Sequence, residues 1–113
     1  MYSAVVIGLG RIGALYSSNV IPRSHIAAYN LNSSVNIVAG IDPSLDSRLK
    51  FKKMWGKDIQ LFKSVKEMLD ADIYPDIVSI CLEPNKLINV VKDLLMVLVF
   101  CILTIVLFVM NIH

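Results

Sequence analysis

A glycine-rich segment near the N-terminus is the part of the sequence whose residue types and spacing most clearly indicate chemistry. Residues 8–13 read Gly-Leu-Gly-Arg-Ile-Gly, directly after the apolar run Ala4 to Ile7. In a G-x-G-x-x-G pattern the first glycine permits a tight turn, the second lets the backbone approach a pyrophosphate, and the third allows close helix packing. The N-terminus of that helix adds unpaired N–H groups and partial positive charge. The pattern therefore predicts a site for the pyrophosphate of a dinucleotide.

An acidic residue after a second apolar run fits the same kind of site. Asp42 follows Val35 to Ile41, and a carboxylate there accepts hydrogen bonds from the hydroxyls of an adenosine ribose. It also repels a 2′-phosphate, so NAD is expected to bind in preference to NADP. The distance along the chain from the glycines requires a long first crossover. The alternative is that Asp42 caps the following helix or begins a turn with Pro43, and the two roles are compatible.

Three short apolar runs are expected to be the strands that position these residues. They are Ala4 to Ile7, Val35 to Ile41 and Asp76 to Leu82. Helices are expected from about 12 to 31 with a break near Pro22, from 44 to about 54, and from 64 to 69, where Ser64 and Glu67 match a capping box. Apolar strands that alternate with helices predict an α/β fold. We expect a Rossmann-like, doubly wound parallel sheet, incomplete at this length, with an apolar C-terminal segment.

Composition excludes several classes of protein. Charged residues make up 18% of the 113 residues and hydrophobic ones 56%, which excludes a disordered chain. A net charge of +2 is too small for a nucleic-acid partner. Cys81 and Cys101 lie in apolar runs and match no metal-ligand spacing, so neither a metal site nor a disulfide is expected. A reducing, cytoplasmic location is the expectation.

The charged residues stop abruptly along the chain. The first is Arg11, and none follows Asp93. This boundary divides the sequence into an expected dinucleotide-binding domain over residues 1–93 and an apolar tail over residues 94–113.

Three interpretations of the tail stay open. Residues 94–112 could contact or span a membrane as an anchor, with the domain on the cytoplasmic side. A buried strand near Val97 to Cys101 is the second interpretation. The third is a truncation or a shifted reading frame, because Leu, Ile, Val, Met and Phe are all encoded with U at the second codon position.

Two other features receive structural interpretations. His25 lies in the first crossover without an acidic neighbour in sequence, so a structural or solvent-facing role is expected. The basic stretch that contains Arg48, Lys50, Lys52, Lys53 and Lys57 is interleaved with apolar residues, which predicts an amphipathic helix with a solvated face.

Four segments, in this order, resemble one oxidoreductase family. They are residues 8–13 (Gly-Leu-Gly-Arg-Ile-Gly), 22–29 (Pro-Arg-Ser-His-Ile-Ala-Ala-Tyr), 39–42 (Ala-Gly-Ile-Asp) and 75–81 (Pro-Asp-Ile-Val-Ser-Ile-Cys). Together they resemble the N-terminal domain of the glucose-fructose oxidoreductase, inositol dehydrogenase and rhizopine-catabolism (Gfo/Idh/MocA) family, over about residues 2–93. The resemblance implies a nicotinamide dinucleotide at the ends of the parallel strands, and hydride transfer with a sugar, cyclitol or related polyol.

The family pattern, carried across residue by residue, implies cofactor-binding roles for three groups of positions. The glycine-loop members are Gly8, Gly10, Arg11, Ile12 and Gly13. The ribose acid is Asp42, and the loop beside the nicotinamide-side ribose contains Pro84 and Asn85.

Two departures from the family pattern concern the reaction itself. Family members commonly have a His shortly after the Pro-Asn pair, whereas Lys86, Leu87 and Ile88 follow here. The family's catalytic lysine lies in a Glu-Lys-Pro motif after the next strand. If Val97 to Cys101 is that strand, the matching residues 102–104 are Ile-Leu-Thr, which cannot take a proton.

The substrate domain of the family is missing as well, so no catalytic residue is assigned. The chain alone is expected to be inactive, with a polyol substrate only if a missing domain is supplied. The alternative is a non-catalytic, membrane-anchored nucleotide-binding module.

Overall fold

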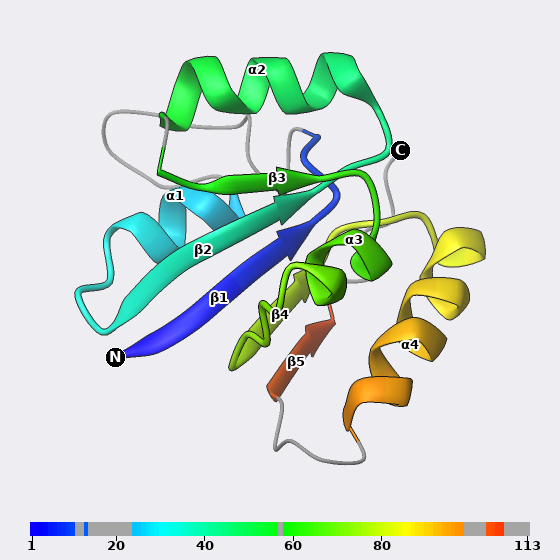
Figure 1. The fold of residues 1–113 in the computed structure, drawn as a ribbon. Helices are drawn as coiled ribbons and strands as arrows, with labels where there is room; N and C mark the ends of the chain where they lie inside the picture. The colour runs from blue at the N-terminus through cyan, green and yellow to red at the C-terminus, as the bar shows by residue number, and fades with distance from the viewer. Residues whose placement is uncertain (11–12, 14–23, 57, 99–103, 108–113) are drawn as a thin grey trace.

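One parallel sheet organises the chain. The computed structural model describes residues 1–10, 13, 24–56, 58–98 and 104–107. Within these residues the strands are β1 (Tyr2–Ile7), β2 (Val35–Ile41), β3 (Gln60–Phe62), β4 (Ile77–Ile80) and β5 (Thr104–Leu107). Their spatial order is β3-β2-β1-β4-β5, and every neighbouring pair is parallel (Figure 1). The chain winds outward from β1 to β3 and then returns to the other side of β1, so its direction reverses between β1 and β4.

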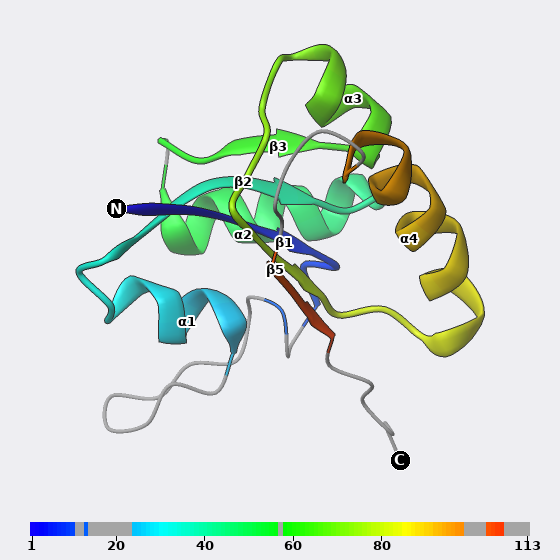
Figure 2. The same ribbon diagram turned by 90° about the horizontal axis from the view of Figure 1, so that it is seen from below.

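Helices cover both faces of this sheet. The described helices are α1 (His25–Asn30), α2 (Leu45–Trp55), α3 (Val65–Asp70) and α4 (Pro84–Leu98). Val6 of β1 packs with Ile26 of α1 and Phe51 of α2, whereas Val5 belongs to the cluster that contains Met68 of α3. Figure 2 shows α1 and α3 on opposite sides of the strands. Neighbouring residues of β1 therefore enter two different cores, which is why its buried residues, Ala4 to Ile7, are all apolar. The expected α/β fold with a doubly wound parallel sheet is confirmed.

Serine caps begin three of the helices. Ser24, Ser44 and Ser64 are the N-caps of α1, α2 and α3, and each hydroxyl accepts a hydrogen bond from a backbone N–H of the first turn. At α3 the Glu67 carboxylate also reaches back and accepts from the Lys63 N–H at 2.7 Å. The expected capping box at Ser64 and Glu67 is confirmed, with the returning bond one residue earlier than the N-cap.

Strands β1, β2 and β4 correspond to the three runs expected from the sequence, and α2 and α3 to two of the expected helices. The expected helix from 12 to 31 appears as α1 in its last part, and residues 14–23 lie outside the described residues. Strand β3 was not expected, because it has only three residues and depends on its pairing with β2, where Ala39 lies opposite Gln60.

Helix α4 crosses the composition boundary at residue 93. Its residues Leu87, Val90, Val91 and Leu94 pack against the core cluster on the α3 side of the sheet. Their spacing of i, i+3, i+4 and i+7 is that of one helix face. The charged residues that end at Asp93 therefore lie on the same helix as the apolar residues that follow.

Strand β5 comes later than the strand expected near Val97 to Cys101. Helix α4 continues through Leu98, and β5 begins at Thr104 and pairs with β4 in parallel, with Ile77 opposite Thr104. The interpretation of a strand there is wrong for Val97 and Leu98, which are the last residues of α4, and residues 99–103 lie outside the described residues. Among the described residues, no helix combines the length and the apolar character that a bilayer crossing requires.

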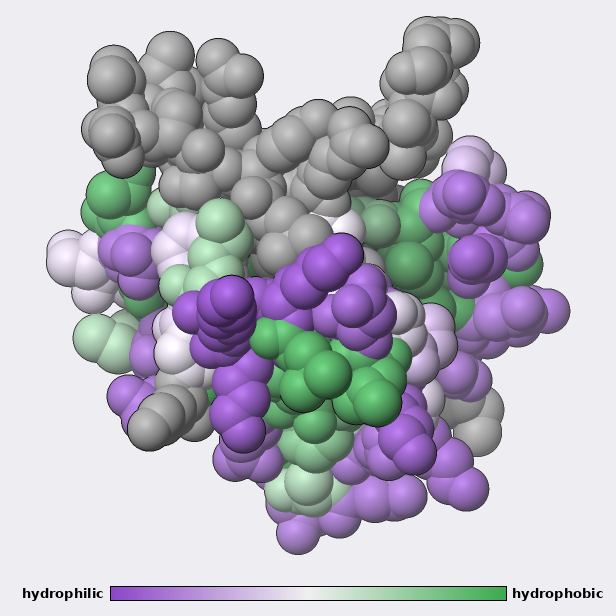
Figure 3. Space-filling view, turned by 90° about the horizontal axis from the view of Figure 1, so that it is seen from above, coloured by the Kyte–Doolittle hydropathy of each residue, from purple (hydrophilic) through white to green (hydrophobic). Residues whose placement is uncertain are grey.

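The outer surface of α2 is mixed in character. Lys50, Lys52 and Lys53 are exposed, as expected for a solvated face, but Leu45 and Leu49 are exposed as well. The face in Figure 3 accordingly shows a small hydrophobic area bordered by hydrophilic side chains. Arg48 differs from these lysines because it is half-buried, and Lys57 lies outside the described residues.

Candidate functional site

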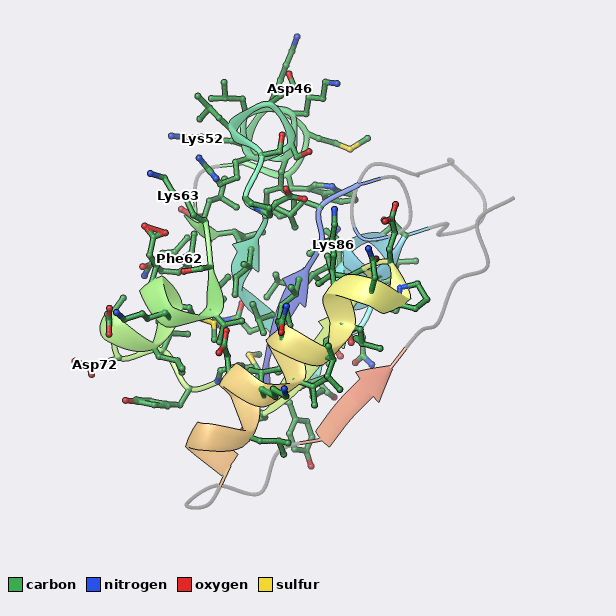
Figure 4. All side chains as sticks on the ribbon, turned by 90° about the vertical axis from the view of Figure 1, so that its right-hand side faces the viewer. Asp46, Lys52, Phe62, Lys63, Asp72 and Lys86 are labelled. Carbon is green, nitrogen blue, oxygen red and sulfur yellow. The ribbon has the colours of Figure 1, made fainter. Side chains whose placement is uncertain are left out.

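The candidate site lies where the carboxyl ends of β1, β2 and β4 meet. In open α/β sheets, ligands bind outside the carboxyl ends of the strands at the point where the winding reverses. Two backbone hydrogen bonds join these ends: the Gly8 N–H donates to the Ile41 carbonyl at 2.8 Å, and the Cys81 N–H donates to the Ile7 carbonyl at 2.7 Å. Figure 4 views the molecule from the side toward which the strands of Figure 1 point.

The first and third glycines of the loop are required by close approach. Gly8 has a φ of 93°, and a Cβ there would collide with the carbonyl of Cys81, the residue directly after β4. A Cβ at Gly13 would collide with the Gly8 carbonyl. A side chain at either position would therefore push the loop away from the sheet, as the roles of these glycines in the motif imply.

The second glycine and the leucine before it differ in what surrounds them. Gly10 is exposed, and a Cβ there would meet no described atom within 4 Å. Leu9 is fully buried in the cluster with Ile26 and Phe51, so its side chain fixes the start of the loop. The backbone at Gly10 is thus open to a ligand while the preceding residue is held in the core.

Asp42 connects the ends of β1 and β2. Its Oδ2 accepts a hydrogen bond from the Leu9 N–H at 2.9 Å, and its Oδ1 accepts from the Ser44 N–H at 2.8 Å. The second bond is the turn-forming role that the sequence left open beside ribose binding. An ionised carboxylate has about four acceptor positions, so capacity remains for ribose hydroxyls. The glycine loop and the acid are therefore parts of one site.

Arg48 also belongs to this site, although the sequence had indicated only a solvated helix face for it. Its Nη1 donates to the Asp42 carbonyl at 2.7 Å, and the side chain is half-buried. Arg48 stands three residues before buried Phe51 and seven before half-buried Trp55, on the inner face of α2. This spacing is the signal that could have separated Arg48 from the exposed lysines.

The residues after β4 border the same edge. A Cβ at Gly8 would lie 3.2 Å from the Leu82 Cδ2, so the end of β4 lies against the glycine loop. Pro84 and Asn85 follow as the first residues of α4, and both are exposed. Lys86 in the same turn also lies at this edge (Figure 4). The structure thus brings the expected Pro84 and Asn85 to the expected edge.

Two of the expected site residues cannot be placed. Arg11 and Ile12 lie outside the described residues, although Gly10 before them and Gly13 after them are described.

A polar contact lies beneath the site, between α1 and β4. The Tyr29 hydroxyl and the fully buried Ser79 hydroxyl share a hydrogen bond. The His25 ring lies with its centroid 6.5 Å from that of Tyr29. Burial lowers the pKa of His25 below its ordinary value of 6.5, which favours the neutral ring at pH 7. The hydrogen bond between Tyr29 and Ser79 joins α1 to β4 of the sheet.

Cys81 directly follows β4 and lies beside Gly8. Burial raises the pKa of its thiol from 9.0 to about 11. The thiolate is the nucleophilic form of cysteine, and the raised pKa keeps this thiol protonated at neutral pH. Within the part of the chain that the structure describes, no three His, Cys, Asp or Glu side chains are grouped so that they could hold a metal ion.

No protein-family model and no curated protein sequence matches the chain. The chemistry of the site must therefore be argued from its own geometry. That geometry combines an open glycine backbone, a carboxylate with free acceptor positions, and one guanidinium beside it.

Proposed function

We propose that the chain binds a nicotinamide dinucleotide, with NAD preferred over NADP, as the cofactor-binding part of a Gfo/Idh/MocA-like oxidoreductase that acts on a sugar, cyclitol or related polyol. The observation that carries the proposal is the 2.9 Å hydrogen bond from the Leu9 N–H to Asp42 Oδ2. It brings the glycine loop after β1 and the acid after β2 into one site at the point where the winding reverses. A dinucleotide requires both of these groups at that place.

The residues of the site fit the parts of such a cofactor. The open backbone at Gly10 suits a pyrophosphate, whose negative charge is attracted by main-chain N–H groups. The remaining acceptor positions of Asp42 suit the adenosine ribose hydroxyls, and exposed Asn85 can hydrogen-bond at the end of β4. When bound, the nicotinamide would supply the group that accepts or releases a hydride.

We propose that these 113 residues by themselves bind the dinucleotide but do not catalyse hydride transfer. Hydride transfer to or from a hydroxyl carbon needs a group that moves the hydroxyl proton. In the family the catalytic Lys follows the strand that corresponds to β5. Here the residues after β5, 108–110, read Phe-Val-Met, and no Lys follows Lys92 in the sequence. The chain by itself should therefore form no NADH with inositol or common sugars, and turnover that disappears in a Gly10→Trp variant would contradict this proposal.

Calorimetric titration of the full chain with NAD tests the binding proposal. Gly10→Ala adds a methyl group where no described atom lies within 4 Å, so the fold should tolerate it while the approach of the pyrophosphate is obstructed. We expect at least tenfold weaker NAD binding with an unchanged thermal midpoint. Asn36→Ala, at an exposed position in the amino-terminal half of β2, is the matched control and should bind NAD normally. Absence of NAD binding by the unmodified chain at millimolar concentration would refute the proposal.

A further inference from the structure

We infer that Arg48 determines cofactor specificity at the adenosine end of the site, and that it lets the chain accept a 2′-phosphorylated dinucleotide with an affinity within about tenfold of that for NAD. The inference deepens the proposed function and rests on it. Asp42 alone predicts strong rejection of a 2′-phosphate, because like charges repel. The surroundings of Asp42 reduce that rejection in three ways.

The first is the position of the guanidinium. Arg48 stands near the start of α2, and its Nη1 reaches back 2.7 Å to the carbonyl of Asp42 itself. The cation is thereby held beside the residue that would meet the ribose. A guanidinium has five N–H donors, so donors remain after this one bond. Their planar arrangement matches the oxygens of a phosphate.

The second is the state of the carboxylate. Both oxygens of Asp42 already accept main-chain hydrogen bonds, from Leu9 at 2.9 Å and from Ser44 at 2.8 Å. These N–H dipoles offset part of the negative charge. With Arg48 beside it, the strand end carries one formal negative and one formal positive charge. A phosphate that arrives there therefore meets weaker repulsion than Asp42 alone would exert.

The third is the position of Asp46, the acidic residue in the first turn of α2. Asp46 is exposed and forms an ion pair with Lys50 at 3.0 Å, on the outer side of α2 (Figure 4). Its charge is solvated and compensated away from Asp42. It therefore adds little to the repulsion of a ligand phosphate.

Helix stability does not account for an arginine at this position. The N-terminal turn of a helix carries partial positive charge, so a cation there is unfavourable and an acid such as Asp46 is favourable. The other basic side chains described on α2 are exposed, whereas Arg48 is turned inward to the end of β2. The Arg48 side chain thus points to the edge of the sheet where a ligand would bind.

The test compares NAD and NADP binding to the full chain by calorimetry in four proteins: unmodified, Arg48→Ala, Arg48→Gln and Lys52→Ala. Arg48→Gln keeps a polar side chain with an N–H donor but removes the charge, so together with Arg48→Ala it shows how much of the effect belongs to the charge. Lys52→Ala removes the same charge from an exposed position one turn further along α2. Circular dichroism and the thermal midpoint report whether each variant is folded.

We expect both Arg48 variants to lose at least tenfold in NADP affinity relative to NAD affinity, while Lys52→Ala leaves the ratio unchanged. An unmodified chain that binds NAD but binds NADP more than about tenfold less tightly would overturn the inference and leave the proposed function intact. An unchanged ratio in folded Arg48→Gln would overturn it in the same way. If the unmodified chain binds neither dinucleotide, the proposed function fails and the inference fails with it.

Discussion

The Leu9 amide donates a hydrogen bond to Asp42 Oδ2 at 2.9 Å, across 33 residues of sequence. This bond joins the loop after the first strand to the turn after the second. Asp42 is therefore a structural residue as well as a candidate ligand-binding residue. Substitutions at Asp42 should change both the stability of the fold and the affinity for a cofactor.

Removal of the Asp42 carboxylate should destabilise the chain. Asp42→Ala leaves the N–H groups of Leu9 and Ser44 without their acceptor, which should lower the free energy of unfolding by about 2 kcal/mol. Asp42→Asn keeps one carbonyl oxygen and should cost less. Urea denaturation measures the difference, and Asp58→Ala, at an exposed acid, is the control. Equal midpoints for Asp42→Ala and the unmodified chain would contradict the bridging role.

The same Asp42→Asn variant should bind NAD less tightly, and its preference for NAD over NADP should narrow. The charge that repels a 2′-phosphate is removed, while Arg48 is retained. Titration with both dinucleotides measures the ratio. Tighter binding of NADP than of NAD by the unmodified chain would show that Asp42 does not set the preference.

A methyl group at Gly8 should be more harmful than one at Gly56. Both glycines have positive φ, 93° and 97°, but only the Cβ at Gly8 would collide with another part of the chain, the Cys81 carbonyl. Gly56→Ala should cost about 1–3 kcal/mol for the backbone conformation alone, because a φ of 97° with a ψ of −168° is adopted almost only by glycine. Gly8→Ala should cost that and at least about 1 kcal/mol more for crowding between β1 and β4. Equal losses of unfolding free energy in the two variants, measured by urea denaturation, would mean that the chain at Cys81 moves aside without an energetic penalty.

The hydrogen bond between Tyr29 and Ser79 should appear as a coupling in a double-mutant cycle. Tyr29→Phe leaves the fully buried Ser79 hydroxyl unpaired and should cost about 1–2 kcal/mol in unfolding free energy. Ser79→Ala combined with Tyr29→Phe should cost less than the sum of the two single changes. Tyr74→Phe, at an exposed tyrosine, should have no effect. Strict additivity would show that the two hydroxyls do not stabilise each other.

Stability should fall at alkaline pH through Cys81. Burial raises the pKa of this thiol from 9.0 to about 11, so between these values the folded chain holds a proton that the unfolded chain has released. The contribution is complete below pH 9 and is lost as pH rises toward 11. Other groups titrate in this range, so the measured quantity is the difference between the unmodified chain and Cys81→Ala. A difference independent of pH from 8 to 11 would contradict the burial of the thiol.

Much of the fold was determined by short stretches of the sequence alone. Strands β1, β2 and β4 are largely apolar runs, because their carboxyl-terminal residues are buried in a sheet that is covered on both faces. The capping box at Ser64 and Glu67 was also visible, since it involves neighbouring residues of one turn. The glycine spacing of residues 8–13 likewise identified a loop whose crowding the structure displays at Gly8 and Gly13.

Features that depend on contacts between distant segments were decided only by the tertiary structure. Strand β3 has three residues and acquires its conformation from pairing with β2. Strand β5 follows α4, and because the sequence is apolar from the end of the helix into the strand, it does not mark where one ends and the other begins. The sequence left the partners of Asp42 open, and it assigned Arg48 to the solvated face of a helix. The approach of the loop after β1 to the end of β2 gives Asp42 the Leu9 N–H as a partner. The burial of Phe51 places Arg48, three residues earlier on α2, beside the Asp42 carbonyl. Local periodicity specifies elements, whereas the direction of a side chain depends on what lies across from it.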